Sequence, residues 1–142
     1  MRSSFDRAFE IVIGLEGHIS DDPNDPGGFT VYGLSSRYNK NITREMTLAQ
    51  AKDKYLYDYW IPAGCDSEST PLDICLFDGA VNPQNDPELP GAGNKELMDL
   101  NPENWQDFLL MRMARYARRS KAIYVKGHMM RIVKLYNAIK GI

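Results

Sequence analysis

The chain has 142 residues, 43% of them hydrophobic and 25% charged, and its formal net charge at pH 7 is −2. This size and composition are typical of a globular protein, and we expect one domain over residues 1–142. The apolar runs fall short of the roughly 20 residues that cross a bilayer, which excludes an integral membrane protein and predicts no stable membrane insertion.

Charges are distributed unevenly along the chain. Every acidic residue lies at or before Asp107, so residues 1–107 have a net charge of −11 and residues 108–142 have one of +9. A basic carboxyl-terminal part suits a polyanion such as nucleic acid, a membrane surface or the bacterial cell wall. Basic side chains on the outside of terminal helices, balancing the acidic part, would produce the same asymmetry.

Signals for export and for metal binding are missing from the sequence. Asp6, Arg7 and Glu10 lie where a signal peptide has its apolar stretch, so we expect synthesis in the host cytoplasm and action on the cell wall after release. Cys65 and Cys75 are too few for a disulfide framework, and no Cys or His pair has zinc-site spacing. We expect both thiols to be free and partly buried, and we expect neither a metal nor a cofactor.

The amino-terminal third combines a helix with a small β element. Apolar residues follow the i, i+3, i+4 spacing of one helical face and predict a helix from Ser4 to Leu15, with Glu16 at its carboxyl end. Residues 17–28 are rich in the turn formers Asp, Asn, Pro and Gly. Residues 29–34 are strand formers and predict a short hairpin beside this loop.

Start and stop signals predict four helices in the rest of the chain. The signals are N-capping Thr or Asn residues, prolines in the first turn and a closing glycine at residue 141. The predicted helices cover Leu48 to Trp60 behind a capping box of Thr47 and Gln50, Pro71 to Asn82 behind Thr70, Pro102 to Ser120 behind Asn101, and Gly127 to Lys140. Residues 83–94 are predicted to form a loop, so the fold class is α+β but mainly helical.

Glu16 and Asp25 form a pair of carboxyl groups in contrasting environments. The negative pole of the helix dipole and the apolar side chains of Val12 and Ile13 favour the protonated form of Glu16. Asp25 lies in a polar, glycine-rich loop that suits the charged form. Cleavage of a glycosidic bond requires such a pair, although most Glu and Asp pairs in proteins are only surface charges.

The residues around this pair resemble the signature of glycoside hydrolase family 108. Glu16–Gly17, the run Asp-Pro-Asn-Asp-Pro-Gly-Gly at 22–28, Thr30 and Tyr32–Leu34 follow the family motif without a gap. The resemblance is strongest over residues 5–82 and looser in the divergent helical part, 83–142. Further matching segments are Tyr57–Trp60, Cys65–Asp66, Leu76–Asn82, Tyr124–Gly127 and Arg131. The resemblance implies a lysozyme-like fold and an N-acetylmuramidase of phage endolysin type.

The chain also departs from the family motif. His18 and Ile19 stand where the motif has a glycine and an aromatic residue, and residues 83–100 replace a helical stretch rich in Gln and Gly. These differences concern the fit of the substrate and the level of activity more than the fold.

The resemblance implies roles for three residues. Glu16 corresponds to the catalytic acid of the family. The order Glu16, Asp25, Thr30 is also similar to the catalytic Glu, Asp and Thr of phage-type lysozymes, with one residue less between the last two. Asp25 and Thr30 would then hold a water on the opposite face of the sugar and give inversion, which requires carboxyl groups about 6.5–9.5 Å apart.

Three further residues are candidate substrate contacts. The amide of Asn82 suits sugar hydroxyls, and the ring of Tyr32 suits the apolar face of a pyranose. His18 offers a sugar contact or a second proton carrier, or is simply a tolerated polar residue. Asp78, one helical turn before Asn82, is expected to be a buried structural carboxylate.

We therefore expect a peptidoglycan hydrolase that cleaves the β-1,4 bond between N-acetylmuramic acid and N-acetylglucosamine, acts as a monomer and serves host cell lysis. Two alternatives use the same residues. One is a peptidoglycan-binding module with weakened catalysis. The other is a lytic transglycosylase, whose products end in anhydro-muramic acid because no water attacks.

A third alternative is nucleic-acid binding through the basic end of the chain. Arg112, Arg115, Arg118 and Arg119 have the spacing of a stripe along one helix. No recognised nucleic-acid motif accompanies them, so a solvated helix face is the preferred interpretation and we expect no nucleic-acid partner.

Overall fold

The computed structural model describes residues 1–16, 19–20, 28–37, 39–83 and 93–142. Within these residues the chain forms six α-helices and three two-residue strands, which confirms the predicted mainly helical α+β class. In chain order the elements are η1 (Arg2–Ser4), α1 (Phe5–Glu16), β1 (Ile19–Ser20), β2 (Thr30–Val31), β3 (Leu34–Ser35), α2 (Leu48–Tyr55), η2 (Leu56–Trp60), η3 (Cys65–Ser67), α3 (Leu72–Val81), α4 (Asn94–Asp99), α5 (Trp105–Arg119) and α6 (Ala122–Ile139).

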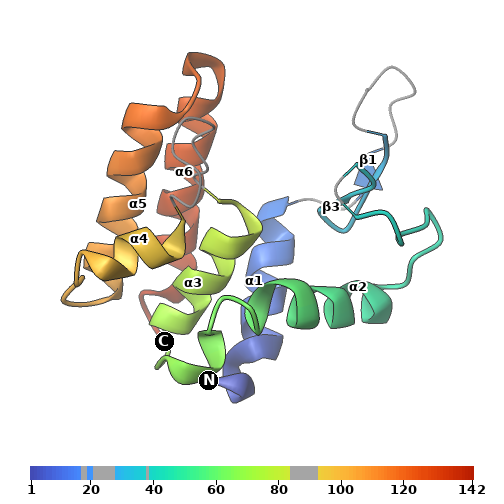
Figure 1. Cartoon of the computed structure of the whole chain (residues 1–142), viewed down its shortest axis with the longest axis horizontal. Coiled ribbons are helices and arrows are strands. Elements are labelled where there is room, and N and C mark those ends of the chain that lie inside the picture. Colours follow the sequence, from blue (N-terminus) through green and yellow to red (C-terminus); the bar gives the residue numbers. More distant parts are fainter. Residues whose placement is uncertain (17–18, 21–27, 38, 84–92) are drawn as a thin grey trace.

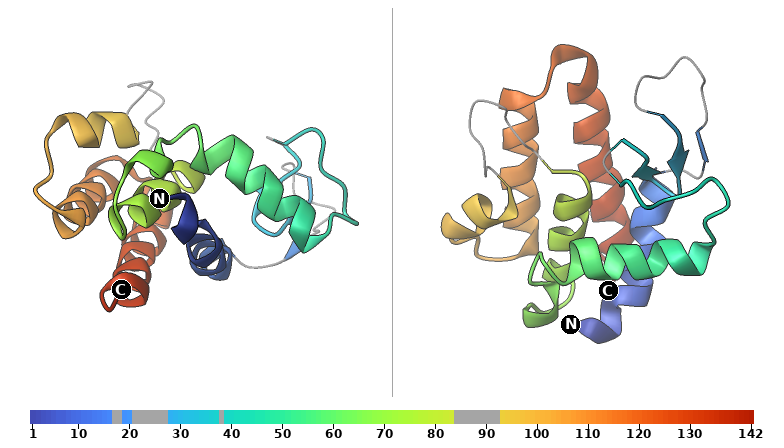
Figure 2. Two further views of the ribbon diagram at one scale, coloured as in Figure 1. Left: turned by 90° about the horizontal axis from the view of Figure 1, so that it is seen from below. Right: turned by 45° about the vertical axis from the view of Figure 1, so that its right-hand side comes forward.

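The α5–α6 pair and the sheet lie on opposite sides of a centre made by α1 and α3 (Figure 1). Helix α2 runs from beneath the sheet toward α3, and the additional views show the same arrangement (Figure 2). The sheet lies toward one end of the molecule. The carboxyl ends of α1 and α3 and the first half of α6 lie toward the same end.

Helix α3 lies at the centre of the core. Its residues 73–79 are all buried, as expected of a helix surrounded by other elements. Five aromatic rings from α1, α2, η2 and α3 pack together, mostly edge to face, with ring centroids 5.3–6.1 Å apart. The rings are those of Phe5, Phe9, Tyr55, Trp60 and Phe77. This cluster fixes α1 and α2 against α3.

The predicted hairpin forms β2 and β3 of an antiparallel sheet with the order β1-β2-β3, in which β2 is the central strand. Val31 pairs with Leu34, so only Tyr32 and Gly33 connect β2 to β3. Both have positive φ, +48° and +80°, as a type I′ turn requires. The hydroxyl of Tyr55 on α2 donates a hydrogen bond of 2.7 Å to the carbonyl of Tyr32. Helix α2 thereby holds the turn in place.

Asp78 on α3 is fully buried and binds arginines from two other helices. Its Oδ2 accepts a hydrogen bond from Arg112 Nη1 of α5 at 2.8 Å, and its Oδ1 accepts two from Arg131 Nε and Nη2 of α6 at 3.0 and 2.7 Å. Burial alone would raise the pKa of Asp78, but the charges and hydrogen bonds of both arginines outweigh it and lower the pKa below its usual 3.8. Asp78 is therefore the predicted buried structural carboxylate, and it is ionised.

Two helix starts differ from those predicted. Helix α5 is capped by Asn104, whose side chain accepts a hydrogen bond from the first turn, and not by Asn101. Asn101 has a φ of +55° and ends α4, because Asn tolerates this left-handed conformation at a helix terminus. Pro71, and not Thr70, takes the N-cap of α3, and the hydroxyl of Thr70 donates a hydrogen bond to Asp73 in the first turn.

Helix α4 and the first five residues of α6 occupy segments that were not predicted as helical, whereas the rest of α6 was predicted. Asn94, at the start of α4, donates a hydrogen bond of 2.6 Å to the carbonyl of Leu76. A Cβ on Gly79 would lie 2.2 Å from Asn94 Oδ1, so the missing side chain lets α4 approach α3. Helix α6 begins at Ala122 and continues through Gly127, because the apolar side chains that α6 buries outweigh the cost of a glycine inside the helix, about 1 kcal/mol.

Other local predictions are confirmed. Thr47 and Gln50 form the capping box of α2, with hydrogen bonds of 3.2 and 2.9 Å. Cys65 and Cys75 are free, and both are more deeply buried than predicted. Burial raises the pKa of each thiol to about 12. No helix of the described residues combines the length and apolar character needed to cross a bilayer.

Replacing Asp78 with Asn is expected to destabilise the fold by about 3–5 kcal/mol, because the buried Arg112 loses its carboxylate partner. Urea unfolding at pH 7 measures this change. Because the folded-state pKa of Asp78 is lowered, its contribution is present above the unfolded value of 3.8 and disappears as the pH falls through the folded value. The difference between the two proteins should therefore shrink in acid.

The matched control is Asp99→Asn, which makes the same chemical change in an exposed ion pair with Lys95. Exposed pairs contribute little to stability, so this variant should unfold close to the unchanged protein. Equal effects of the two substitutions would contradict a structural role of the buried carboxylate.

Candidate active site

The carboxyl end of α1 lies at the centre of the candidate site. Glu16 is the last residue of α1, at the negative pole of the helix dipole, as predicted. One turn earlier, Val12 is buried and Ile13 packs against the core. Asp25 and His18 lie outside the described residues. The helix end itself lies between the sheet and the α5–α6 pair (Figure 1).

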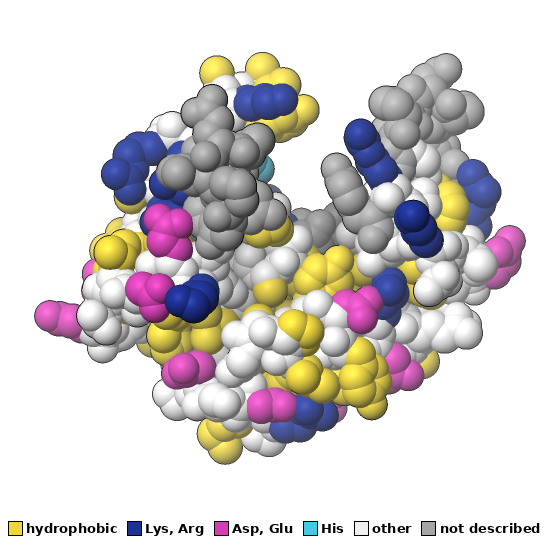
Figure 3. All heavy atoms as spheres, viewed as in Figure 1, with side chains coloured by type: hydrophobic (Ala, Val, Ile, Leu, Met, Phe, Trp, Pro, Cys, Tyr) yellow, Lys and Arg dark blue, Asp and Glu magenta, His cyan; other side chains and the backbone are white. Residues whose placement is uncertain are grey.

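The sheet supplies the other predicted residues on this side. Thr30 is half-buried in β2, where its neighbours across the sheet are Ser20 on β1 and Ser35 on β3. Tyr32 is half-buried in the following turn and packs partly against the core. This face of the molecule is hollowed between the sheet and the α5–α6 pair (Figure 3). Thr30 and Glu16 therefore belong to elements that border the same hollow.

A polar cavity of about 220 Å³ lies next to the end of α1. Leu15, the residue directly before Glu16, lines it, together with residues from the end of α3 and the middle of α6. These are Asn82, Gly127, His128, Arg131 and Lys134. Segments far apart in the sequence thus meet at the position where the predicted catalytic acid lies.

Asn82 is held in this cavity by a buried tyrosine. The hydroxyl of Tyr116 donates to the carbonyl of Asn82 at 2.8 Å and accepts from its Nδ2 at 3.0 Å. The same hydroxyl accepts a third hydrogen bond, of 3.1 Å, from Arg112 Nη2. No described residue donates a hydrogen bond to Asn82 Oδ1. This atom is therefore able to accept a hydrogen bond from a ligand.

His128 is a cavity residue that the sequence reasoning missed. Its ring lies 4.6 Å from that of Tyr116, centroid to centroid, and its Nδ1 is 2.6 Å from Ser120 Oγ. Burial and the charge of Arg131 lower the pKa of His128 below its usual 6.5, so the ring is neutral at pH 7. Since Ser120 bonds to Nδ1, the ring offers Nε2 to a sugar hydroxyl, as a donor or as an acceptor according to the tautomer.

The sequence contains a signal that would have found this wall of the cavity. His128, Arg131 and Lys134 recur every three residues, the spacing of one helical face. A helix that began only at Gly127, as predicted, would have these residues in its first turns. The observed start at Ala122 places them within the helix, where they share one cavity.

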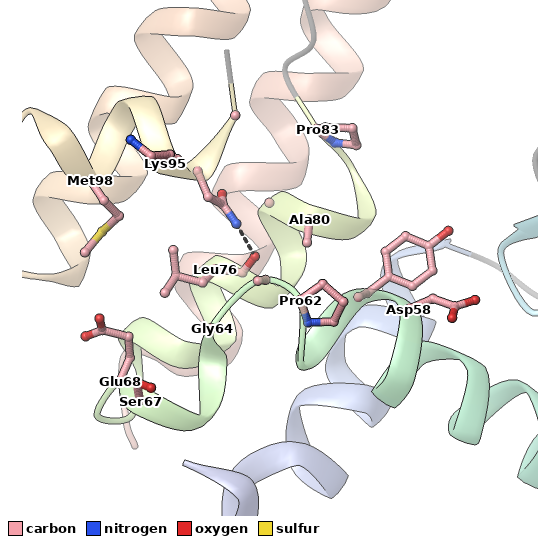
Figure 4. Close-up of a pocket in the computed structure, with 15 residues that line it drawn as sticks. Asp58, Pro62, Gly64, Ser67, Glu68, Leu76, Ala80, Pro83, Lys95 and Met98 are labelled. Carbon is pink, nitrogen blue, oxygen red and sulfur yellow. Dashed lines mark hydrogen bonds between the residues drawn. The ribbon is translucent and has the colours of Figure 1, made fainter. Parts of the chain in front are cut away.

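A larger hollow of about 680 Å³ lies between η3, α3 and α4 (Figure 4). Its wall is mostly apolar and includes Leu76, Ala80 and Met98, with charged side chains at the edge. Pro83 lines this hollow and its chain neighbour Asn82 lines the smaller cavity. Both hollows therefore reach the carboxyl end of α3, as a groove for an extended polymer would.

The four arginines of α5 form neither the basic stripe that was considered nor the solvated helix face that was preferred from the sequence. Arg112 and Arg115 are buried and paired with Asp78 and Glu96, while the other two arginines of the set are at least partly exposed. Helix α5 therefore presents no continuous row of four arginines to a polyanion. In the described ranges, no group of three or more His, Cys, Asp or Glu side chains is placed to hold a metal ion.

Comparisons with known proteins agree with this arrangement. A family model described as glycosyl hydrolase 108 matches residues 9–83, which is more than half of the chain and includes the end of α1 and all three strands. No curated protein matches the chain.

Among solved structures, one titled "Structure of Brucella abortus SagA" superposes with a TM-score of 0.70 and 20% sequence identity, over 99% of this chain and 96% of that chain. At this identity the likeness shows the fold alone, and it supports the predicted lysozyme-like architecture over nearly the whole length. The family match shows the rest: the chain belongs to glycosyl hydrolase family 108 and is a glycoside hydrolase.

Proposed function

We propose that the protein is an N-acetylmuramidase that hydrolyses the β-1,4 bond between N-acetylmuramic acid and N-acetylglucosamine in peptidoglycan. The observation that carries the proposal is the position of Glu16. It ends α1 beside a polar cavity of about 220 Å³, within the segment matched by the family model. A pocket of this size and polarity suits a sugar unit of the glycan strand.

Glu16 acts as the general acid in this proposal. The dipole of α1 disfavours a negative charge at its carboxyl end, and the apolar Val12 and Ile13, one turn earlier, make that end of the helix less polar. Both effects favour a protonated carboxyl group near neutral pH. The proton then passes to the glycosidic oxygen as the bond to the leaving sugar breaks.

A water molecule completes the hydrolysis from the opposite face of the sugar. Asp25 and Thr30 hold it, with the carboxylate taking its proton and the hydroxyl orienting it. The position of Thr30 on β2, across the hollow from the α5–α6 pair, supports this assignment. Attack from the opposite face would invert the configuration at the anomeric carbon.

Sugar contacts are assigned to residues on both sides of the hollow. Asn82 Oδ1 accepts a hydrogen bond from the substrate while Tyr116 holds the rest of the amide in place. Tyr32 binds from the side of the sheet, and His18 is proposed as a further sugar contact. In the cell, the protein works as a monomer, is made in the cytoplasm and reaches the wall after release, where it lyses the host.

Glu16→Gln is expected to lower hydrolysis of purified, outer-membrane-free walls by at least about 100-fold, because the amide has no proton to donate. Turbidity loss and the release of reducing ends measure this. Glu10→Gln is the matched control, since it changes an exposed carboxylate of the same helix and should leave activity unchanged.

The chemistry of the released ends separates the proposal from its alternatives. Reducing muramic ends support the hydrolase, whereas anhydro-muramic ends would identify a lytic transglycosylase. Binding of walls without any released ends, by the unchanged protein as well as the variant, would identify a wall-binding module.

Asp25→Ala and Thr30→Ala are expected to lower kcat by different amounts. A general base contributes about 100- to 10,000-fold, and orientation by one neutral hydrogen bond contributes about tenfold. Kinetics on the same walls should therefore show the larger loss for Asp25→Ala. A larger loss for Thr30→Ala would show that Thr30 contributes more than Asp25 to activating the water. Unchanged kcat values for both variants would exclude both residues from the catalytic step.

A further inference from the structure

The α5–α6 pair exposes a strip of large apolar side chains, which we call the apolar face. On α6 these side chains recur at intervals of three and seven residues, the spacing of one helical face, and one more joins them from α5. Their exposed fractions lie between 39% and 79%. The residues of the apolar face are Leu110, Ile123, Met130, Val133 and Tyr136.

A groove of about 330 Å³ between the two helices belongs to this face. Leu110 lines it from α5, and Val133 and Tyr136 line it from α6, so residues of the apolar face meet across it. Its other lining side chains are Leu109, Met113 and Ile132, which are apolar, and Gln106. Exposed apolar side chains that are joined in this way, unlike single scattered ones, are typical of an interaction surface.

Basic side chains lie on the same face. Lys126 comes three residues after Ile123, and Lys140 comes four residues after Tyr136, whose ring centroid lies 5.9 Å from the Lys140 ammonium nitrogen. Lys126 forms no ion pair within the described part of the chain. Helix α6 contains no acidic residue, and Asp107 is the last one in the chain. At the turn between α5 and α6, hydrophobic and basic side chains lie next to each other on the surface (Figure 3).

The combination of apolar and positively charged side chains selects the partner. An anionic lipid surface offers acyl chains to the apolar residues and phosphate groups to the lysines. A second copy of the chain would bring its own lysines against Lys126 and Lys140, and like charges placed together oppose association. A nucleic acid or an acidic wall polymer would bind the lysines but would make no use of Met130 and Val133.

We infer that the apolar face docks on an anionic lipid bilayer, with its apolar side chains among the headgroups and upper acyl chains and with Lys126 and Lys140 at the phosphates. This is binding to the surface, since no helix of the described residues is long and apolar enough to cross a bilayer. The inference goes beyond the proposed function and uses none of its residues.

The catalytic cavity lies on another side of α6. Arg131 lines that cavity, and Val133 of the apolar face follows two residues later, which is about 200° around the helix. The groove and the cavity share no lining residue. A chain bound to a bilayer through the apolar face would therefore keep the cavity open to the glycan.

Flotation with lipid vesicles tests the charges of this surface. The protein should bind vesicles made of equal parts phosphatidylglycerol and phosphatidylcholine, and bind much less to phosphatidylcholine alone. Lys126→Gln combined with Lys140→Gln should weaken binding to the anionic vesicles about 25-fold, at about fivefold per lysine. The matched control is Lys40→Gln combined with Lys95→Gln, which removes two exposed lysines outside α5 and α6 and should change binding less than about twofold.

Replacing apolar side chains tests the other half of the surface at unchanged charge. Met130→Ser combined with Val133→Ser should weaken binding to the anionic vesicles by about tenfold or more, because both side chains lose their contact with the lipid. Leu48→Ser combined with Ile61→Ser is the matched control. These two side chains are similarly exposed, at 49% and 39%, but lie outside the α5–α6 pair, so binding should not change. Circular dichroism confirms that all four variants are folded.

Three results would overturn the inference. One is no preference for anionic vesicles, or an equal loss of binding in the control variants. Another is full binding by Met130→Ser with Val133→Ser, which would show only attraction of a polyanion to the basic surface. The third is a dimer in sedimentation equilibrium that the same variant dissociates, which would show that a second copy covers the face.

Assays on membrane-free walls separate this inference from the proposed function. Lys126→Gln with Lys140→Gln should hydrolyse purified walls at the unchanged rate, and Glu16→Gln should bind vesicles like the unchanged protein. If Glu16→Gln still hydrolyses walls, the catalytic assignment fails, whereas the vesicle results still support the docking surface. If the anionic vesicles bind none of the proteins, the docking surface fails and the catalytic assignment stands.

Discussion

The carboxylate of Asp78 accepts hydrogen bonds from guanidinium groups of two different helices in the middle of the protein. Each charge in this cluster would be costly to bury alone, so the three side chains tolerate burial only together. Such a cluster contributes less to net stability than to specificity, because only one register of α5 and α6 against α3 brings the groups together. The positions of the surrounding polar residues follow from that register.

Two features of the site depend directly on this cluster. Arg112 also donates to the hydroxyl of Tyr116, and that hydroxyl holds both the carbonyl and the amide of Asn82. Arg131 lies with one side against Asp78 and the other along the cavity. The end of α1 carries the proposed chemistry, whereas the cluster on α3, α5 and α6 decides what surrounds it.

Local signals in the sequence predicted much of this fold. The helical spacing in residues 5–16 placed Glu16 correctly at the end of α1, and the strand formers at 29–34 indicated the hairpin. Thr47 and Gln50 marked the start of α2 because a capping box involves only neighbouring residues. Signals of this kind need no information from the rest of the chain.

Predictions failed where tertiary contacts decide between local options. Asn101 and Asn104 are both capable of capping a helix. Because α4 packs against α3, Asn101 follows the end of α4 and Asn104 caps the start of α5. The spacing of the arginines on α5 suggests an exposed face. Arg112 and Arg115 are nevertheless buried, because they pair with Asp78 and Glu96. The cavity itself joins Leu15 to residues beyond 126, a proximity that no local pattern contains.

Burial makes both thiols of the protein unreactive. With a pKa of about 12, only about one in 10⁵ of either thiol is a thiolate at pH 7, and the thiolate is the species that attacks disulfides and reacts with oxidants. Neither Cys65 nor Cys75 has surface accessible to a reagent. The folded chain therefore keeps both thiols out of thiol–disulfide exchange, in a reducing and in an oxidising environment alike.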